Sequence, residues 1–203
     1  MTTNISVLVS GRGSNFLSIL DAAAEGLIKD VNFACVISDK KEAKALERAR
    51  DNNIEAVFVD PKSFSSRAEF DREVIRILKE HDTDLVLLAG YMRIITEELV
   101  DAYAGKIMNI HPALLPAFKG LHAQKQALDY GVKVAGCTVH FVEADLDAGP
   151  IIIQRTVPVL PGDTEDSLAD RILAEEHKAY PEAVRLFAEG KLEILGRNVI
   201  IKE

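Results

Sequence analysis

The feature that most constrains this fold is a repeated order of apolar run, turn and helical segment in the first half of the chain. Runs rich in Val, Ile and Leu occupy residues 4–10, 31–38, 55–59 and 84–89. Between them, segments with helical spacing begin near residue 14 and cover residues 43–52 and 66–80. Strands that alternate with helices usually form a parallel sheet with helices on both faces. We therefore predict an α/β fold with a parallel sheet in its N-terminal half.

The second half of the chain has a different pattern, in which one strand follows another. Apolar runs at residues 134–142 and 151–157 flank an acidic turn, which predicts an antiparallel pair. A long helix begins at Thr164 and is expected to bend or restart at Pro181, before a short hairpin at residues 192–201. The prediction is a twisted, mostly parallel sheet flanked by helices, with an antiparallel C-terminal hairpin, in a single domain of residues 1–203.

Composition excludes several classes of partner. With 203 residues, of which 48% are hydrophobic, the chain can bury a core in one globular domain. A net charge of −8 disfavours nucleic-acid binding, because phosphate contacts need clustered Lys and Arg. No apolar run approaches the roughly 18 residues of a membrane span, and the N-terminus lacks a signal-peptide pattern. Cys35 and Cys137 lie in predicted strands, so we expect reduced thiols in a cytoplasmic protein.

A glycine-rich turn follows the first predicted strand and precedes a helix. Gly11, Gly13, Ser14 and Asn15 would place free backbone N–H groups at the helix start, where the helix dipole favours a phosphate. The dinucleotide pattern Gly-x-Gly-x-x-Gly is incomplete, because Phe16 occupies the place of its third glycine. Two interpretations remain open from these residues alone: a phosphate site, or a tight turn in which Ser14 caps the helix.

A candidate catalytic pair lies at the end of the predicted strand that precedes Pro112. Side chains alternate along a strand, so Asn109 and His111 are expected on the same side. An Asn amide can donate to a developing oxyanion, and His can transfer protons in both directions near neutral pH. Polar residues at a strand end can also simply bind a loop, so this tripeptide alone leaves both roles open.

Three other stretches carry weaker signals. The loop at residues 90–95 is apolar and follows a central strand, which is typical either of a ligand crevice or of core closure. Arg67 lies in the first turn of a predicted helix, where a cation suggests an external anion or only a solvated side chain. The acidic turn contains Asp145 and Asp147 without an EF-hand pattern or a third partner, so we predict no metal site.

Four motifs resemble the phosphoribosylglycinamide formyltransferases of purine synthesis, which belong to the folate-dependent formyltransferases. They are Gly-x-Gly-Ser-Asn at 11–15, Gly-Tyr-Met-Arg-Ile at 90–94, Asn-Ile-His-Pro-x-Leu-Leu-Pro at 109–116, and the run from Val-His-Phe-Val at 139 to Leu-Asp-x-Gly-Pro at 146–150. The resemblance covers essentially the whole chain. The Glu-His-x-x-Tyr-Pro segment at 176–181 and Gly13-Ser14-Asn15 resemble the glycinamide ribonucleotide enzymes in particular.

The resemblance implies a Rossmann-like formyltransferase fold and transfer of formyl from 10-formyltetrahydrofolate to the amine of phosphoribosylglycinamide. Matching positions would make Asn109, His111 and Asp147 catalytic, with Gly13, Ser14, Asn15 and Glu176 binding the nucleotide. The implied folate-binding residues are Arg67, Met92, Arg93, Ile94, Ile95, Asn109, Glu143, Ala144, Asp145, Leu146 and Asp147. Folate would be a consumed co-substrate with no tightly bound cofactor, and the protein a monomer or weak homodimer that binds small molecules, without nucleic-acid or membrane partners.

The chain departs from the family's frequent Ser, Gly and Val at Ala113, Ala148 and Ile151, which are small changes beside the site. Some relatives carry a further His where this chain has Gln124, so that position receives no role. The alternatives are a formyl-folate hydrolase, a formyltransferase for initiator tRNA or a nucleotide sugar, a nicotinamide-dependent dehydrogenase with Asp39 as its ribose acid, and a non-catalytic phosphate-binding module. The acidic charge and the expected absence of extra domains argue against the tRNA and sugar enzymes.

Overall fold

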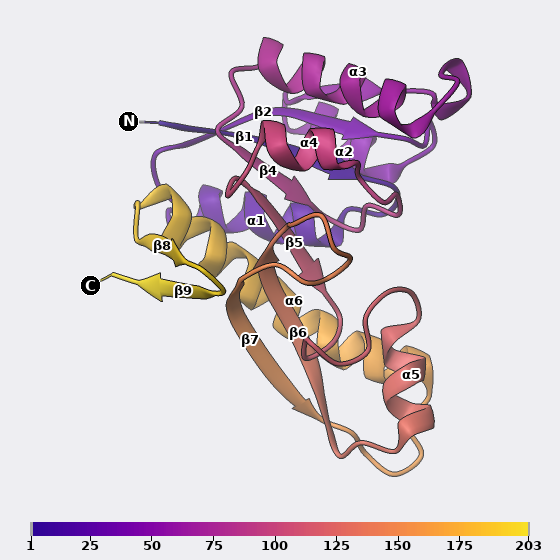
Figure 1. Cartoon of the computed structure of the whole chain (residues 1–203). Coiled ribbons are helices and arrows are strands. Elements are labelled where there is room, and N and C mark those ends of the chain that lie inside the picture. The colour runs from indigo at the N-terminus through magenta and orange to yellow at the C-terminus, as the bar shows by residue number, and fades with distance from the viewer. Residues whose placement is uncertain (1, 203) are drawn as a thin grey trace.

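The computed structural model describes residues 2–202, which form one mixed sheet of nine strands with helices on both faces (Figure 1). The strands are β1 (Thr3–Val9), β2 (Val31–Ser38), β3 (Glu55–Phe58), β4 (Leu85–Leu88), β5 (Ile107–His111), β6 (Val134–Phe141), β7 (Ile151–Pro158), β8 (Leu192–Leu195) and β9 (Asn198–Ile201). The helices are α1 (Ser14–Ala24), α2 (Lys44–Asp51), the 3-10 helix η1 (Pro61–Ser63), α3 (Arg67–Glu80), α4 (Glu97–Ala102), α5 (Ala123–Tyr130) and α6 (Glu165–Ala188).

The sheet changes from parallel to antiparallel along its width. Its strand order is β3-β2-β1-β4-β5-β6-β7-β9-β8. Strands β1 to β5 pair in parallel, whereas β6 runs antiparallel to both β5 and β7, and β8 antiparallel to β9. The predicted α/β fold, with a mostly parallel sheet and an antiparallel C-terminal hairpin, is therefore confirmed.

Alternation along the central strands divides the core between the two faces of the sheet. In β1, Val7 and Val9 face a core shared with α1, α2 and α6. Leu8 faces the opposite core, where α3 contributes Phe70 and α4 contributes Leu99. Figure 1 shows α3 and α4 above the sheet and α1 and α6 below it. Two-sided burial explains why these strands read as continuous apolar runs.

One detail of the helices differs from expectation. A restart at Pro181 is wrong, because α6 continues from Glu165 to Ala188 with this proline inside it. Pro181 is buried among the core residues of α6, so packing offsets the backbone hydrogen bond that a proline cannot make. At the start of α3, the Ser66 hydroxyl accepts from the Glu69 N–H and caps the helix, and the Glu69 carboxylate accepts from Ser65.

The thiols of Cys35 and Cys137 are both free and buried, as expected. Burial raises their pKa values to about 11 for Cys35 and about 12 for Cys137, so both remain protonated near neutral pH. Among residues 2–202, no helix is both long enough and apolar enough to cross a membrane.

The parallel half of the sheet determines where a ligand can bind. The chain moves outward from β1 to β3 on one side and from β4 to β5 on the other, so β1 and β4 are neighbours at the point where the order reverses. In open α/β sheets, ligands bind in the crevice outside the carboxyl ends of strands at this point. The loop after β1, the loop after β4 and the end of β5 all lie at this edge.

Candidate active site

The turn between β1 and α1 has a backbone that only glycine suits. Gly13 has φ +68°, and a Cβ added to it would lie 2.6 Å from the Cβ of Ala45 in α2. Ser14 is the first residue of α1, and no side chain caps this helix. The interpretation of Ser14 as a side-chain cap is therefore wrong, and the N–H groups of the first turn remain available to an anion.

A hollow of about 250 Å³ lies beside this turn. It is formed by the glycine-rich loop and the loop after β4, and is lined by Ser10, Gly11, Arg12, Gly13, Ser14, Asn15, Ala89, Gly90 and Met92. Ser10 fastens the two loops together: its N–H donates to the Gly90 carbonyl at 3.1 Å, and its hydroxyl accepts from the Met92 N–H at 2.9 Å. The expected phosphate loop and the expected folate loop are therefore joined through one serine.

Asn15 and Glu176 connect this loop to α6. The Asn15 Nδ2 donates to the Glu176 Oε2 at 2.8 Å, and both side chains are buried. Burial raises the pKa of Glu176, although the hydrogen bond from Asn15 opposes this effect. The Asn15 Oδ1 is buried without a hydrogen-bond partner in the described part of the chain. Two residues that are distant in sequence thus form one polar contact beside the hollow.

Asp147 lies between two histidines. Its Oδ2 is 3.5 Å from the Nδ1 of His111, and its Oδ1 is 4.0 Å from the Nε2 of His140. Its Oδ2 also accepts from the Gly120 N–H at 2.8 Å, while the His111 Nε2 is 2.8 Å from the Phe118 carbonyl. The side chains of His111 and Asp147 are only 6% and 8% exposed, which strengthens their electrostatic interaction. The imidazole and carboxylate are therefore held within reach of each other.

His140 is the member of this cluster that sequence reasoning missed. It is the cross-strand partner of Asn109, and its Nε2 is 3.3 Å from the Asn109 Nδ2. The His140 Nδ1 is 2.8 Å from the Phe141 carbonyl, so Nδ1 carries the hydrogen and Nε2 accepts from the amide. Burial lowers the pKa of His140, which favours this neutral form. The Val-His-Phe-Val motif contains this histidine, but no role was given to it, because the pairing of its strand with the strand of Asn109 was not predicted.

The loops that carry these groups are held by buried hydrogen bonds. After β5, the Thr138 hydroxyl donates to the Ala113 carbonyl at 2.6 Å and accepts from the Leu115 N–H at 3.0 Å. Before β7, Gly149 lies so close to β6 that an added Cβ would be 1.8 Å from the Phe141 carbonyl oxygen. Asp147 has φ +47°, a conformation that Asp tolerates better than most residues. The position of the carboxylate therefore depends on tight backbone packing.

Apolar side chains are exposed in the loops near this cluster. Met92, Ile94 and Leu146 are 65%, 58% and 51% exposed, and Leu121 is 71% exposed. Ile95 instead packs against the core, and Arg93 lies 4.2 Å above the ring of Phe70. Glu143, Ala144 and Asp145 are exposed. Arg67 is exposed at the start of α3, and within residues 2–202 no hydrogen bond joins it to the cluster around Asp147.

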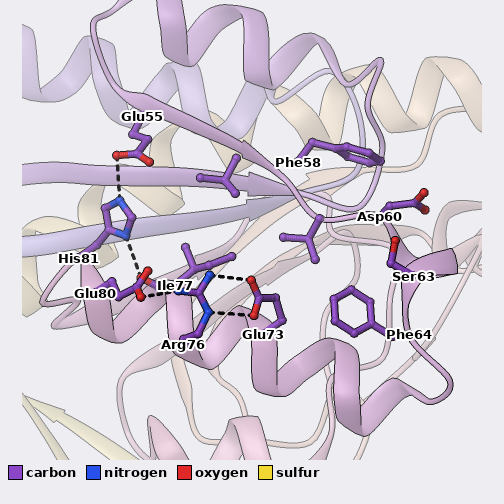
Figure 2. Close-up of a pocket in the computed structure, with 12 residues that line it drawn as sticks. Glu55, Phe58, Asp60, Ser63, Phe64, Glu73, Arg76, Ile77, Glu80 and His81 are labelled. Atoms are coloured by element: carbon purple, nitrogen blue, oxygen red, sulfur yellow. Dashed lines mark hydrogen bonds and ion pairs between the residues drawn. The ribbon is translucent and has the colours of Figure 1, made fainter.

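A second hollow, of about 300 Å³, lies between β3 and α3, and its charged groups are already paired (Figure 2). Figure 2 shows Arg76 between Glu73 and Glu80, and His81 between the Ile77 carbonyl and Glu55. These charged groups satisfy one another, and the residues that line this hollow include none of those predicted to bind a substrate or to act in catalysis. We therefore place the candidate active site at the edge near Asn109 and Asp147.

A comparison with protein families identifies the family of this chain. A family model described as formyl transferase matches residues 3–184, which contain every polar group of the cluster. The chain belongs to the formyl transferase family.

Several members of this family are close to the chain in sequence and structure. It is 44% identical to a phosphoribosylglycinamide formyltransferase of Escherichia coli, over 94% of this chain and 90% of that protein. It is 45% identical to the trifunctional purine biosynthetic protein adenosine-3 of Drosophila melanogaster, of which it spans only 14%. The structure superposes on glycinamide ribonucleotide transformylase 1 of Symbiobacterium toebii with a TM-score of 0.97 and 54% identity, covering 100% of this chain and 95% of that one.

A related enzyme with different chemistry is less similar. A formyltetrahydrofolate deformylase from Pseudomonas syringae has a TM-score of 0.90 but 28% identity, and the chain covers 67% of it. The similarities in sequence and in length therefore favour the transferases over the hydrolase within this formyl transferase family.

Proposed function

We propose that this protein transfers the formyl group of 10-formyltetrahydrofolate to the amine of phosphoribosylglycinamide, a step of purine synthesis. The observation that carries the proposal is the 3.5 Å separation between Asp147, in the loop between β6 and β7, and His111, on the strand β5 that also bears Asn109. These residues lie at the same edge of the sheet as the glycine-rich turn between β1 and α1. The nearly full-length similarity to proteins named phosphoribosylglycinamide formyltransferase or glycinamide ribonucleotide transformylase supports this reaction.

The nucleotide would bind with its phosphate at the start of α1. The backbone of Gly13 and the side chains of Ser14 and Asn15 would donate to the phosphate oxygens, aided by the helix dipole. Glu176, which contacts Asn15 beside the hollow, would accept from the ribose hydroxyls. Such a carboxylate pairs well with a neutral diol and poorly with a second phosphate.

The folate would lie against the exposed apolar loops. Met92, Ile94 and Leu146 expose apolar surface that a flat pterin ring would cover, with an energetic gain of roughly 25 cal/mol per Å². The residues proposed to contact the folate are Arg67, Met92, Arg93, Ile94, Ile95, Asn109, Glu143, Ala144, Asp145, Leu146 and Asp147. The folate would act as a co-substrate that leaves after each turnover, and no tightly bound cofactor enters the proposal.

The chemistry follows from the groups around the formyl carbon. The amine attacks this carbon and forms a C–N bond, while the carbonyl electron pair moves to oxygen. Asn109 would donate to this oxyanion, as would His111 once the substrate replaces the Phe118 carbonyl as the partner of its Nε2, and loss of one such donor typically costs about 10²–10³ in rate. Collapse of the intermediate breaks the bond to the folate N10. One proton leaves the amine and one reaches N10, a transfer that His111 and Asp147 would serve.

A single assay separates transfer from hydrolysis. The protein is incubated with 10-formyltetrahydrofolate, with and without phosphoribosylglycinamide, and both tetrahydrofolate and the formylated nucleotide are measured. The proposal predicts that release of tetrahydrofolate requires the nucleotide and equals the formylated product in amount. Release of tetrahydrofolate and formate at the same rate without the nucleotide would support the hydrolase instead.

The nucleotide site has its own test. Replacing both Ser14 and Asn15 with Ala removes two side-chain donors while leaving the turn at Gly13 unchanged. Titration calorimetry with each substrate alone is expected to show weaker binding of phosphoribosylglycinamide and nearly unchanged binding of the folate. Equal weakening of both ligands would contradict the separate placement of the two substrates.

A further inference from the structure

We propose that Tyr180 is a positioning residue that holds Asn109 at a fixed distance from the proposed nucleotide-binding loop. This inference rests on the proposed function. The Tyr180 hydroxyl lies 2.9 Å from the Met108 carbonyl oxygen and 3.1 Å from the Leu88 carbonyl oxygen. One hydrogen is thus shared between β5 and β4. The side chain is fully buried on α6, which places it away from any substrate.

The two carbonyls belong to the positions at which the two strands begin to separate. The register of β4 with β5 ends at the pair Leu88 and Asn109. Beyond this pair, Ala89 and Gly90 turn toward the hollow beside the glycine-rich loop, while β5 continues to His111. The hydroxyl therefore ties the strands together one residue before the amide that would stabilise the oxyanion.

The same helix also reaches the nucleotide side of the site. Glu176 lies one turn before Tyr180 on α6, and it contacts Asn15 at 2.8 Å. Residues four apart lie on the same face of a helix. The buried face of α6 thus touches the proposed phosphate loop through one residue and the catalytic strand through another. Tyr180 holds the second of these contacts, so it sets the distance between the bound amine and the oxyanion donor.

A purely structural tyrosine would not need a hydroxyl at this place. The ring of Tyr180 packs in the same core as α1 and the sheet, and Phe would supply nearly the same packing. A buried hydroxyl costs free energy unless it is hydrogen-bonded, and here it meets two strand carbonyls rather than water. The hydroxyl therefore contributes the alignment of two strands, while the ring contributes to the core.

The substitution Tyr180→Phe tests this role, because it removes only the hydroxyl. We expect kcat to fall about tenfold, since small displacements of a catalytic group are costly, while both KM values stay within about twofold. Hydrogen exchange gives a readout that does not depend on activity. Exchange at the amides of residues 109–111 should become faster, whereas exchange in β2 and β3 should be unchanged.

Tyr103→Phe is the matched control. Tyr103 is also buried, at 6% exposure, but in the opposite core near α3 and α4, and we expect its variant to keep the parent kcat and exchange pattern. The proposal is overturned if Tyr180→Phe retains the parent kcat, or if exchange accelerates equally in all strands. Failure of the parent protein to formylate the nucleotide would remove the proposed function, but local exchange at residues 109–111 would still report on the Tyr180 contact.

Discussion

At the scale of single residues, the site depends on which hydrogen of the Asn109 amide is free. One of its two N–H groups points to the Nε2 of His140 at 3.3 Å, which leaves the other for a substrate oxygen. The His140 Nδ1 is committed to the Phe141 carbonyl, so the ring can act at Nε2 only as an acceptor. A neutral, buried imidazole thus orients the amide without contacting the substrate.

We predict that His140→Leu lowers kcat between about 10- and 100-fold, because Asn109 loses the acceptor that aims it. Steady-state kinetics with both substrates saturating would measure this. His122→Leu is the control, since the His122 side chain is 73% exposed and lies outside the cluster. A His140→Leu enzyme with the parent kcat would show that the amide needs no such orientation.

The same residue has a predictable effect on stability at acid pH. Burial lowers the pKa of His140 below that of an unfolded histidine, which is about 6.5. The unfolded chain therefore binds a proton more readily, and the stability that neutral His140 provides is present above pH 6.5. It is lost as the pH falls from there through the lowered folded value. Denaturant titrations should show that the free energy of unfolding decreases less on acidification in His140→Leu than in the parent protein.

At the scale of elements, the β1–α1 turn is defined by one glycine. We predict that Gly13→Ala lowers the free energy of unfolding by about 2 kcal/mol or more, because the residue has φ +68° and its new Cβ would meet Ala45. Binding of phosphoribosylglycinamide should weaken in parallel. Gly11→Ala is the matched control, as a Cβ there meets nothing within 4 Å. Chemical denaturation and calorimetry would measure both effects, and equal behaviour of the two variants would contradict the argument.

Helix α6 gives a second prediction at this scale. Burial raises the pKa of Glu176 above its ordinary 4.5, so its stabilising contribution is full below pH 4.5 and is lost as the pH rises through the raised value. Glu176→Gln keeps an oxygen that can accept from Asn15 but removes the charge. We therefore expect a higher melting temperature at pH 7, together with a KM for phosphoribosylglycinamide raised about tenfold, because hydrogen bonds to charged groups are the stronger ones.

The comparison that decides this prediction is between pH 4 and pH 7. The stability gain of Glu176→Gln should be present at pH 7 and disappear near pH 4, where the parent carboxyl is already neutral. A lower melting temperature at pH 7 would instead mean that the carboxylate stabilises the fold. An unchanged KM would show that Glu176 does not contact the nucleotide.

At the scale of the whole molecule, the sequence predicted the features that depend on residues close together in the chain. The apolar runs, the helices between them and the antiparallel pair β6–β7 follow from short periodic patterns. The shared side of Asn109 and His111 follows from the alternation of a strand. Of the two interpretations of the glycine-rich turn, the one in which Ser14 caps α1 is wrong, because the residue lies inside the first turn, one position later than a cap.

What the sequence alone could not predict was the pairing of distant strands. The position of His140 opposite Asn109 requires β6 to pair with β5 in one particular register. The Tyr180 contact joins residues 92 positions apart, and no local pattern encodes such a distance. The catalytic role proposed for Asp147 came from the resemblance to known formyltransferases, and the structure adds the 3.5 Å separation from His111.

The most direct test of the whole account is transfer of a labelled formyl group from 10-formyltetrahydrofolate to phosphoribosylglycinamide by the parent protein and by His111→Ala, in single-turnover experiments. Calorimetry of each substrate on both proteins would show whether binding is kept. The account predicts transfer by the parent and a loss of about 10²–10³ in rate for the variant, with both dissociation constants nearly unchanged. Transfer by His111→Ala at the parent rate would contradict it.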